Sequence, residues 1–250
     1  MYLLIFLIGA SIGSFVCVVV ERRRENRNYV KGRSTCDFCN RTIPFYLMIP
    51  VFSYIFLKGR CKYCNEKINV LTFVCEVVGG IIFLILYFIF GLSLELILWT
   101  AAIFTYMCVF FSDLLYMDIY TKDLIFVTAI EVIIFRQELS AHLLSGALLI
   151  VVMGIIYIGF KGKTGLGDVY LAFPLGFLTE GILSYYSLCY GYVLGAIYGI
   201  ILLIRKKKKD TKIPLGSFLI LGTFINLGVI FWRGNNLYLM SLMKEFLQLK

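Results

Sequence analysis

Long runs of apolar residues, divided by short glycine-marked or charged breaks, constrain this chain more than any other feature. A helix needs about 20 apolar residues to cross about 30 Å of hydrocarbon. Of the 250 residues, 60% are hydrophobic and only 16% are charged, which excludes a soluble globule with an ordinary polar surface. We therefore expect an all-α polytopic membrane protein with about eight transmembrane helices. The expected spans are approximately 1–20, 74–92, 94–112, 122–136, 140–160, 168–183, 185–204 and 214–232.

The basic residues gather in the loops that these spans place on one side. Residues 21–73 hold 11 of the 24 Lys and Arg residues, and residues 205–212 hold another six. Because Lys and Arg are enriched in cytoplasmic loops, we expect that side to be cytoplasmic, with the N-terminus outside the cell membrane and no cleaved signal peptide. The net charge of +9 then reflects topology and contact with anionic lipid headgroups. No nucleic-acid partner is expected, since the basic run 205–209 lacks interleaved aromatic residues.

Two Cys-x-x-Cys pairs lie in the long polar segment 21–73, which we expect to be a small cytoplasmic insert. The pairs are Cys36 with Cys39 and Cys61 with Cys64. Four thiolates at this spacing can meet on one tetrahedral ion, so the pattern favours a structural zinc ion in a zinc-ribbon-like fold. Two disulfides or a redox pair are the alternative, which a reducing cytoplasm disfavours.

Two further features of this region concern its approach to the membrane. The apolar segment 49–54 lies between the cysteine pairs, and we expect it to rest on the membrane surface or pack against the spans. Glu76 stands at the start of the second expected span. A lone acid there is typical of the interface, where it can neutralise an arginine of the insert.

Two acids stand at the ends of apolar runs on the expected cytoplasmic side. Asp113 follows the third run, and Asp168 begins the sixth, preceded by Gly165 and Gly167. The two glycines permit backbone angles and close contacts that a β-carbon would block. Two carboxylates within a few ångströms share one proton, and such a pair can hydrolyse a peptide without a covalent intermediate. The alternative is that each acid caps its span or pairs with a neighbouring lysine.

The remaining polar residues near the spans have simpler interpretations. We expect Asp118 and Asp123 to be solvated loop residues. Glu131 is expected to extend toward water or to pair with Arg136. His142 is the single histidine, and we expect it to be solvated at an outer turn. With no second histidine, neither a histidine pair for a metal nor a serine hydrolase dyad is predicted.

In their order and spacing these motifs resemble the type IV prepilin peptidases, bifunctional membrane enzymes that cut prepilin leaders and N-methylate the new terminus. The resemblance covers nearly the whole chain. It rests on both cysteine pairs, Glu76, Asp113, Gly9-Ala10-Ser11-Ile12-Gly13-Ser14-Phe15, Ile49-Pro50-Val51-Phe52-Ser53-Tyr54, Gly59-Arg60-Cys61 and Gly165-Leu166-Gly167-Asp168.

The resemblance implies that Asp113 and Asp168 are the catalytic dyad, similar to that of the presenilin-like Gly-x-Gly-Asp proteases, with Gly165, Gly167 and Glu76 in support. Asp113 is preferred to Asp118 because the family pattern runs from the aspartate through six residues to an isoleucine, here Ile119. This chain departs from the pattern in having Tyr120 in place of a proline and Tyr170 in place of a lysine.

The resemblance also implies that the cysteine-bearing insert serves methyl transfer, with S-adenosylmethionine as donor. No Gly-x-Gly-x-x-Gly loop is present to hold that donor, so its binding residues are unassigned. The implied substrate is a prepilin or pseudopilin precursor, cut at the cytoplasmic face between its basic leader and its hydrophobic N-terminal helix.

Together these inferences predict a membrane aspartic endopeptidase and N-methyltransferase that serves pili, secretion or DNA uptake. The predicted domains are a first helix (1–20), the four-cysteine insert (21–73), the peptidase core (74–232) and a tail (233–250). A peptidase without methyltransferase activity is one alternative. The other is a non-enzymatic scaffold or transporter that uses the acids as an ion relay.

Overall fold

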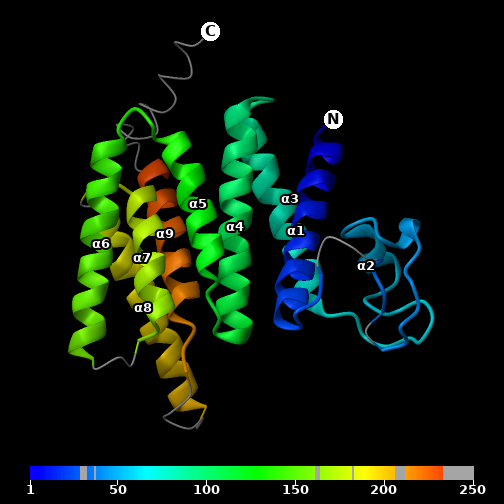
Figure 1. Cartoon of the computed structure of the whole chain (residues 1–250). Coiled ribbons are helices and arrows are strands. Elements are labelled where there is room, and N and C mark those ends of the chain that lie inside the picture. The colour runs from blue at the N-terminus through cyan, green and yellow to red at the C-terminus, as the bar shows by residue number, and fades with distance from the viewer. Residues whose placement is uncertain (29–32, 37, 161–163, 182, 206–211, 233–250) are drawn as a thin grey trace. The chain divides into compact units, whose positions relative to one another are not determined.

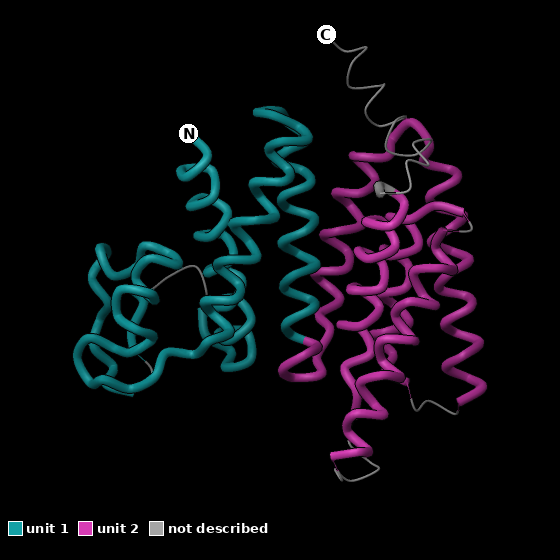
Figure 2. Tube along the Cα trace, turned by 180° about the vertical axis from the view of Figure 1, so that it is seen from behind, with its two compact units in different colours: residues 1–112 teal, residues 113–250 magenta. Residues whose placement is uncertain are grey.

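The computed structural model describes residues 1–28, 33–36, 38–160, 164–181, 183–205 and 212–232, and over these residues the chain is mainly helical, apart from the insert between α1 and α3 (Figure 1). It forms two compact units, residues 1–112 and 113–250 (Figure 2). The boundary falls inside one helix, α4, which spans Leu94–Tyr116. The expected all-α polytopic fold is confirmed.

Unit 1 is organised around two helices that pack along their length, α1 (Tyr2–Arg24) and α3 (Val70–Phe90). Small residues make this close approach possible. A β-carbon at Gly79 of α3 would lie 2.8 Å from the carbonyl oxygen of Gly9 and 2.9 Å from the Cα of Gly13, both on α1. The two backbones therefore touch where the first expected span carries its glycines.

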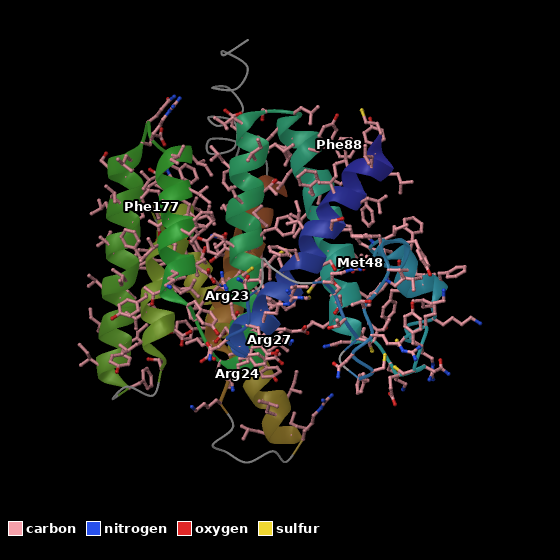
Figure 3. All side chains as sticks on the ribbon, turned by 45° about the vertical axis from the view of Figure 1, so that its right-hand side comes forward. Arg23, Arg24, Arg27, Met48, Phe88 and Phe177 are labelled. Atoms are coloured by element: carbon pink, nitrogen blue, oxygen red, sulfur yellow. The ribbon has the colours of Figure 1, made fainter. Side chains whose placement is uncertain are left out.

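Charge separates the two ends of these helices. Arg23, Arg24 and Arg27 gather where α1 ends, and Phe88 lies toward the opposite end of α3 (Figure 3). The insert leaves and rejoins the helices at the arginine-bearing end, and it contains the short helices η1 (Phe45–Leu47) and α2 (Phe52–Phe56). These three arginines thus lie at the same end of the helices as the insert.

Unit 2 is built around α7 (Leu166–Leu178), which packs against every other complete helix of this unit. Most of its residues are buried, including Leu171, Ala172 and Phe177, because it is surrounded on all sides. The helices around it are α5 (Thr121–Ile134), α6 (Leu139–Gly159), α8 (Leu183–Ile204) and α9 (Leu215–Trp232).

Each of the eight expected spans coincides with a helix, within a few residues at either end. Among the described residues five helices are long and apolar enough to cross a membrane, namely α1, α3, α4, α6 and α8, while α7 and α9 are shorter apolar helices. The largest difference is at α7, which ends at Leu178 instead of near residue 183. The chain turns there through Gly181, whose φ of +60° suits a residue without a β-carbon.

Candidate functional site

Asp113 lies in the last turn of α4, where unit 2 begins, and only 5% of its surface is exposed. Its Oδ2 accepts two hydrogen bonds from Ser217, one from the backbone N–H at 2.6 Å and one from Oγ at 2.8 Å. Ser217 is the third residue of α9, where backbone N–H groups have no partner within the helix and the helix dipole favours negative charge. The start of α9 therefore holds and stabilises this buried carboxylate.

Asp168 is the third residue of α7, the position that Ser217 has in α9, and it is 7% exposed. Its Oδ2 accepts a hydrogen bond from the backbone N–H of Gly165 at 3.2 Å, which is one half of a capping box. The free N–H groups at the start of α7 again favour a negative charge. The start of α7 thus carries one carboxylate, that of Asp168, and the start of α9 binds the other, that of Asp113.

The two carboxylates meet at Gly216 of α9. A β-carbon built on Gly216 would lie 3.0 Å from Asp168 Oδ1 and 3.1 Å from Asp113 Oδ2. Because both distances start from one point, the two oxygens can be no farther apart than 6.1 Å. The structure therefore brings together the two acids that the sequence singled out, with room for little more than a water molecule between them.

The glycines before Asp168 act through space and not through unusual backbone angles. Gly165 has a φ of −71°, which any residue can adopt. A β-carbon at Gly167 would lie 3.0 Å from the Cβ of Ile119, and one at Gly165 would lie 3.2 Å from Asp168 Oδ2. Of the two properties expected of these glycines, unusual backbone angles and close contacts, the structure shows the close contacts.

Sequence reasoning missed two residues at this site, Gly216 and Ser217, and it named Ile119 only as part of a family pattern and not as a packing residue. A signal was present, because Pro214 directly precedes α9, and a proline at this position is typical of a helix start. A helix start on the expected cytoplasmic side would have suggested backbone donors for a carboxylate.

Two acids predicted to be solvated are instead buried. Asp123 lies in the first turn of α5 and is 6% exposed, and Glu131 of the same helix is fully buried. The prediction that Glu131 extends toward water is therefore wrong. Asp118 lies in the loop between α4 and α5 and is half-buried, so the loop position expected for it is correct. In a helix whose residues are apolar on all sides, the sequence does not reveal which face turns inward.

His142 is also buried, contrary to the prediction of a solvated turn residue. It lies in the first turn of α6 with 1% of its surface exposed, and its ring stacks on Phe135 with centroids 4.1 Å apart. Nδ1 lies 2.5 Å from the carbonyl oxygen of Phe177 on α7. The single histidine thus joins two helices of unit 2.

The two cysteine pairs of unit 1 form two copies of the same turn, 25 positions apart. In the first copy the N–H of Cys36 donates to the carbonyl of Arg41, and the N–H of Asn40 donates back to the carbonyl of Cys36. In the second copy Cys61 and Asn65 make the same two bonds, the former to Glu66. Both asparagines have φ values between 50° and 65°, a conformation that asparagine tolerates better than most residues.

These turns place the four sulfur atoms of Cys36, Cys39, Cys61 and Cys64 within 4.8 Å of one another. The Sγ atoms of Cys36 and Cys64 are 3.8 Å apart, too far for a disulfide. A tetrahedral zinc ion with Zn–S bonds of about 2.3 Å separates its sulfur ligands by about 3.8 Å. The cluster fits a metal ion in both geometry and chemistry.

Glu76 is buried in unit 1, at the point where the insert folds back on α3. Its carboxylate accepts hydrogen bonds from the backbone N–H of Val51 at 2.7 Å and from Ser14 Oγ of α1 at 2.9 Å. These partners replace the insert arginine that the sequence suggested. Val51 adopts a φ of +65°, which is strained for a β-branched residue. Tyr54 stacks on Phe73 of α3 at 4.7 Å, so the segment 49–54 packs against a span as predicted.

Two adjoining cavities of about 250 and 380 Å³ lie between the insert and the helices of unit 1. The smaller is lined by Glu76, Ser14 and Arg22 among others, and the larger reaches Cys36 and Cys61. Glu21 and several apolar side chains line both cavities. Cavities of this size with a few convergent polar groups are typical of small-molecule sites.

Comparisons with known proteins bear on both halves of the chain. Residues 7–90 match the family model described as the Bacterial Peptidase A24 N-terminal domain. A relative from Bacillus subtilis (strain 168), named "Prepilin leader peptidase/N-methyltransferase", is 29% identical over 200 residues, which cover 78% of this chain and 81% of the relative. A relative of the same name from Legionella pneumophila is 25% identical over 93% of this chain and 91% of its own length.

A third relative, from Escherichia coli O78:H11 (strain H10407 / ETEC), is named "Type 4 prepilin-like proteins leader peptide-processing enzyme". It is 26% identical over 86% of this chain and 88% of its own length. No solved structure shows a significant match.

Proposed function

We propose that this chain, which is similar over most of its length to proteins named prepilin leader peptidase/N-methyltransferase, is a member of that family. On that premise it is a membrane aspartic endopeptidase that removes the leader of type IV prepilin-like precursors and methylates the new N-terminus. The observation that carries the peptidase half is the meeting of Asp113 and Asp168 at Gly216, with their oxygens no more than 6.1 Å apart. Two buried carboxylates at this distance cannot both ionise cheaply and therefore share one proton.

The proposed chemistry follows from the hydrogen bonds around the pair. Ser217 places two donors on Asp113 Oδ2, which stabilise negative charge on that oxygen, so we assign Asp113 the role of base. It takes a proton from a water molecule held between the carboxylates, and the water oxygen attacks the carbonyl carbon of the scissile peptide. Asp168 gives its proton to the carbonyl oxygen, which leaves a tetrahedral diol. As the C–N bond breaks, Asp113 passes the proton that it took from water to the departing nitrogen, and a hydroxyl of the diol returns a proton to Asp168.

The distribution of charge supports a substrate with a basic leader and an apolar helix. The two acids lie at the ends of α4 and α7 that adjoin the basic loops in the sequence. The positive-inside rule places these loops in the cytoplasm and the N-terminus of the chain outside. The membrane is then the inner, cytoplasmic membrane. A prepilin or pseudopilin whose hydrophobic stem lies among membrane lipids would then present its cleavage site at that face.

For the transferase half we propose that the cysteine-bearing insert holds a structural zinc ion through Cys36, Cys39, Cys61 and Cys64. The ion would fix the two turns that border the cavities of unit 1. A methyl donor such as S-adenosylmethionine carries a positive sulfonium centre, and the carboxylates of Glu21 and Glu76 line a cavity that could bind it. The domain division 1–20, 21–73, 74–232 and 233–250 belongs to this proposal, with the tail outside the described residues.

The peptidase assignment is tested by incubating purified variants with a prepilin from the same organism and following leader removal. Asp113→Asn and Asp168→Asn should each abolish cleavage while the protein stays inserted in the membrane. Asp118→Asn is the matched control, because it removes a nearby half-buried carboxylate outside the pair and should retain activity. Full cleavage by either of the first two variants would reject the dyad.

The transferase assignment is tested by the mass of the mature substrate. One added methyl group on its first residue supports the bifunctional enzyme, and its absence supports the peptidase-only alternative. Cys36→Ser and Cys61→Ser should reduce bound zinc and should lower methylation more than cleavage. If neither cleavage nor methylation occurs with a matched substrate, the non-enzymatic scaffold or ion-relay alternative is favoured.

A further inference from the structure

An apolar face of the insert stays exposed after the insert has packed against α3. Residues 42–57 form the longest stretch of the insert without a charged residue. Seven large side chains of this stretch are exposed over 42–84% of their surface, and together they make up the exposed apolar face: Phe45, Tyr46, Met48, Ile49, Phe52, Ile55 and Phe56. An apolar patch of this kind indicates an interaction surface.

The hydrogen bonds that hold this segment place it alongside the helices of unit 1. The backbone N–H of Val51 and the hydroxyl of Ser14 on α1 both donate to Glu76 of α3. Ser14 lies seven residues before Glu21, the first charged side chain of α1. Glu76 lies seven residues after Asn69, the residue that caps the start of α3. At 1.5 Å per residue, both contacts are about 10 Å inside the polar ends of their helices.

The figures show the same placement. In Figure 1 the insert, which contains α2, lies beside the half of α1 that ends at Arg24. In Figure 3 Met48 lies at a level between Phe88, toward the other end of α3, and the pair Arg24 and Arg27. Both α1 and α3 are long and apolar enough to cross a membrane. The exposed apolar face thus lies on the membrane side of these arginines, at the depth of about 5–10 Å that interfacial helices occupy.

Basic side chains border the exposed apolar face. The guanidinium of Arg33 lies over the ring of Phe45, 5.3 Å from its centroid. Lys62 Nζ lies 5.2 Å from the ring centroid of Tyr46 and donates a hydrogen bond to its hydroxyl at 3.1 Å. In the sequence, residues 33–67 hold six basic and two acidic residues. Aromatic rings and basic groups at the edge of an apolar centre are typical of surfaces that lie among lipid headgroups.

We propose that lipid of the surrounding bilayer covers the exposed apolar face, with acyl chains against its centre and anionic headgroups at its basic border, Arg33, Lys58 and Lys62. A second copy of the chain is disfavoured as the occupant, because two faces with the same basic border repel one another. The insert is then held by lipid as well as by its hydrogen bond to Glu76. The four-cysteine cluster that it carries stays close to the membrane surface.

The first test measures contact with acyl chains, using the full-length protein in nanodiscs of phosphatidylcholine and phosphatidylglycerol. The two tryptophans of the chain, Trp99 and Trp232, are replaced by phenylalanine, so that Phe56→Trp supplies the single fluorescent reporter. Its emission should be quenched by lipids brominated on their acyl chains and should not respond to acrylamide in the water. Ile55→Trp is a second reporter on the same face and should behave alike.

Phe38→Trp is the matched control, because Phe38 is a 66% exposed phenylalanine of the same insert outside the exposed apolar face. It should be quenched by acrylamide and not by the brominated lipids. The proposal is overturned if Phe56→Trp and Ile55→Trp both respond as this control does. It is also overturned, in favour of a second copy, if brominated lipids have no effect and the emission changes between discs that hold one and two protein molecules.

The second test uses the cost of a charge in lipid. New carboxylates at exposed positions that face water change little, whereas carboxylates that face acyl chains are driven out toward water. The double variant Ile55→Asp/Phe56→Asp should therefore be cut by trypsin after Lys58 faster than the wild type in the same nanodiscs, while Phe38→Asp should be cut there at the wild-type rate. Equal rates for the double variant and the wild type would reject the contact with acyl chains.

The contribution of anionic headgroups is measured with the wild-type protein. Replacing phosphatidylglycerol by phosphatidylcholine removes the negative charges that face the basic border, so trypsin should cut after Lys58 faster in the uncharged discs. The same cleavage rate in both kinds of disc would reject the assignment of anionic headgroups to this border.

Discussion

The position of Gly216 between the two carboxylates leads to a quantitative prediction. Replacing it with alanine places a methyl group 3.0 Å from Asp168 Oδ1, 3.1 Å from Asp113 Oδ2 and 2.7 Å from the Cδ1 of Ile119. Ordinary contacts of a β-carbon lie at 3.4–4 Å, so each of these groups must move by a few tenths of an ångström or more. The methyl group also takes the space in which a water molecule would meet both acids.

We expect the Gly216→Ala variant to lose about 100-fold in the rate of leader removal, which corresponds to about 2.7 kcal/mol of activation free energy. Displacements of this size at a reacting centre have effects of this order. Alanine is the stronger helix former by about 1 kcal/mol, so the start of α9 should form at least as readily as in the wild type. The loss should therefore appear in the rate constant for cleavage and not in the amount of inserted protein.

The assay is single-turnover cleavage of a purified prepilin by the variant in detergent or lipid, followed by the shift in substrate mass. Gly228→Ala provides the matched control, because it makes the same change in the same helix at a position with no atom within 4 Å of the new methyl group. The control should cleave at the wild-type rate. Wild-type cleavage by Gly216→Ala would refute the inference that the two acids act together at this glycine.

Three further predictions concern single contacts. Ser217→Ala removes the Oγ donor to Asp113 but keeps the backbone donor, so we expect a loss of about tenfold in the cleavage rate, measured in the same assay. Gly13→Ala should lower the free energy of unfolding by about 1–3 kcal/mol, because the new β-carbon on α1 would collide with α3. Thermal or denaturant unfolding measures this loss. Gly154→Ala is the control, since its methyl group meets no atom within 4 Å, and it should be neutral. Glu76→Gln weakens the acceptor for two donors of unit 1 and should lower methylation of the mature substrate while cleavage continues; equal losses of both activities would contradict this separation.

The spacing of residues along the chain predicted most of the long helices and the cysteine turns, which depend on neighbours in sequence. A helix was found at each of the eight expected spans, because a continuous run of apolar residues in a membrane protein satisfies its backbone hydrogen bonds within a helix whatever its partners are. The cysteine turns were found for a similar reason, since each Cys-x-x-Cys-Asn segment closes through its own backbone hydrogen bonds. Such local determinants are visible in a single sequence.

Burial within the membrane helices was predicted less well. Glu131 and His142 were expected near water, yet both are buried in unit 2. A polar residue in a soluble helix marks the outer face, whereas in a helix that is apolar on all sides the same residue can face lipid, a neighbouring helix or an interior cavity. The choice depends on which helices pack together, and composition does not encode that.

The sequence by itself determined the class of fold, the number and place of the helices, the cysteine turns and the two acids most worth attention. Only the tertiary structure decided that Asp113 and Asp168 meet, and that Ser217, 104 residues from Asp113, supplies the donors. The physical reason is that a helix N-terminus offers unpaired N–H groups to whatever carboxylate packing brings near it. Packing in unit 2, with α7 at its centre, brings the starts of α7 and α9 to the end of α4, and the site exists through that convergence.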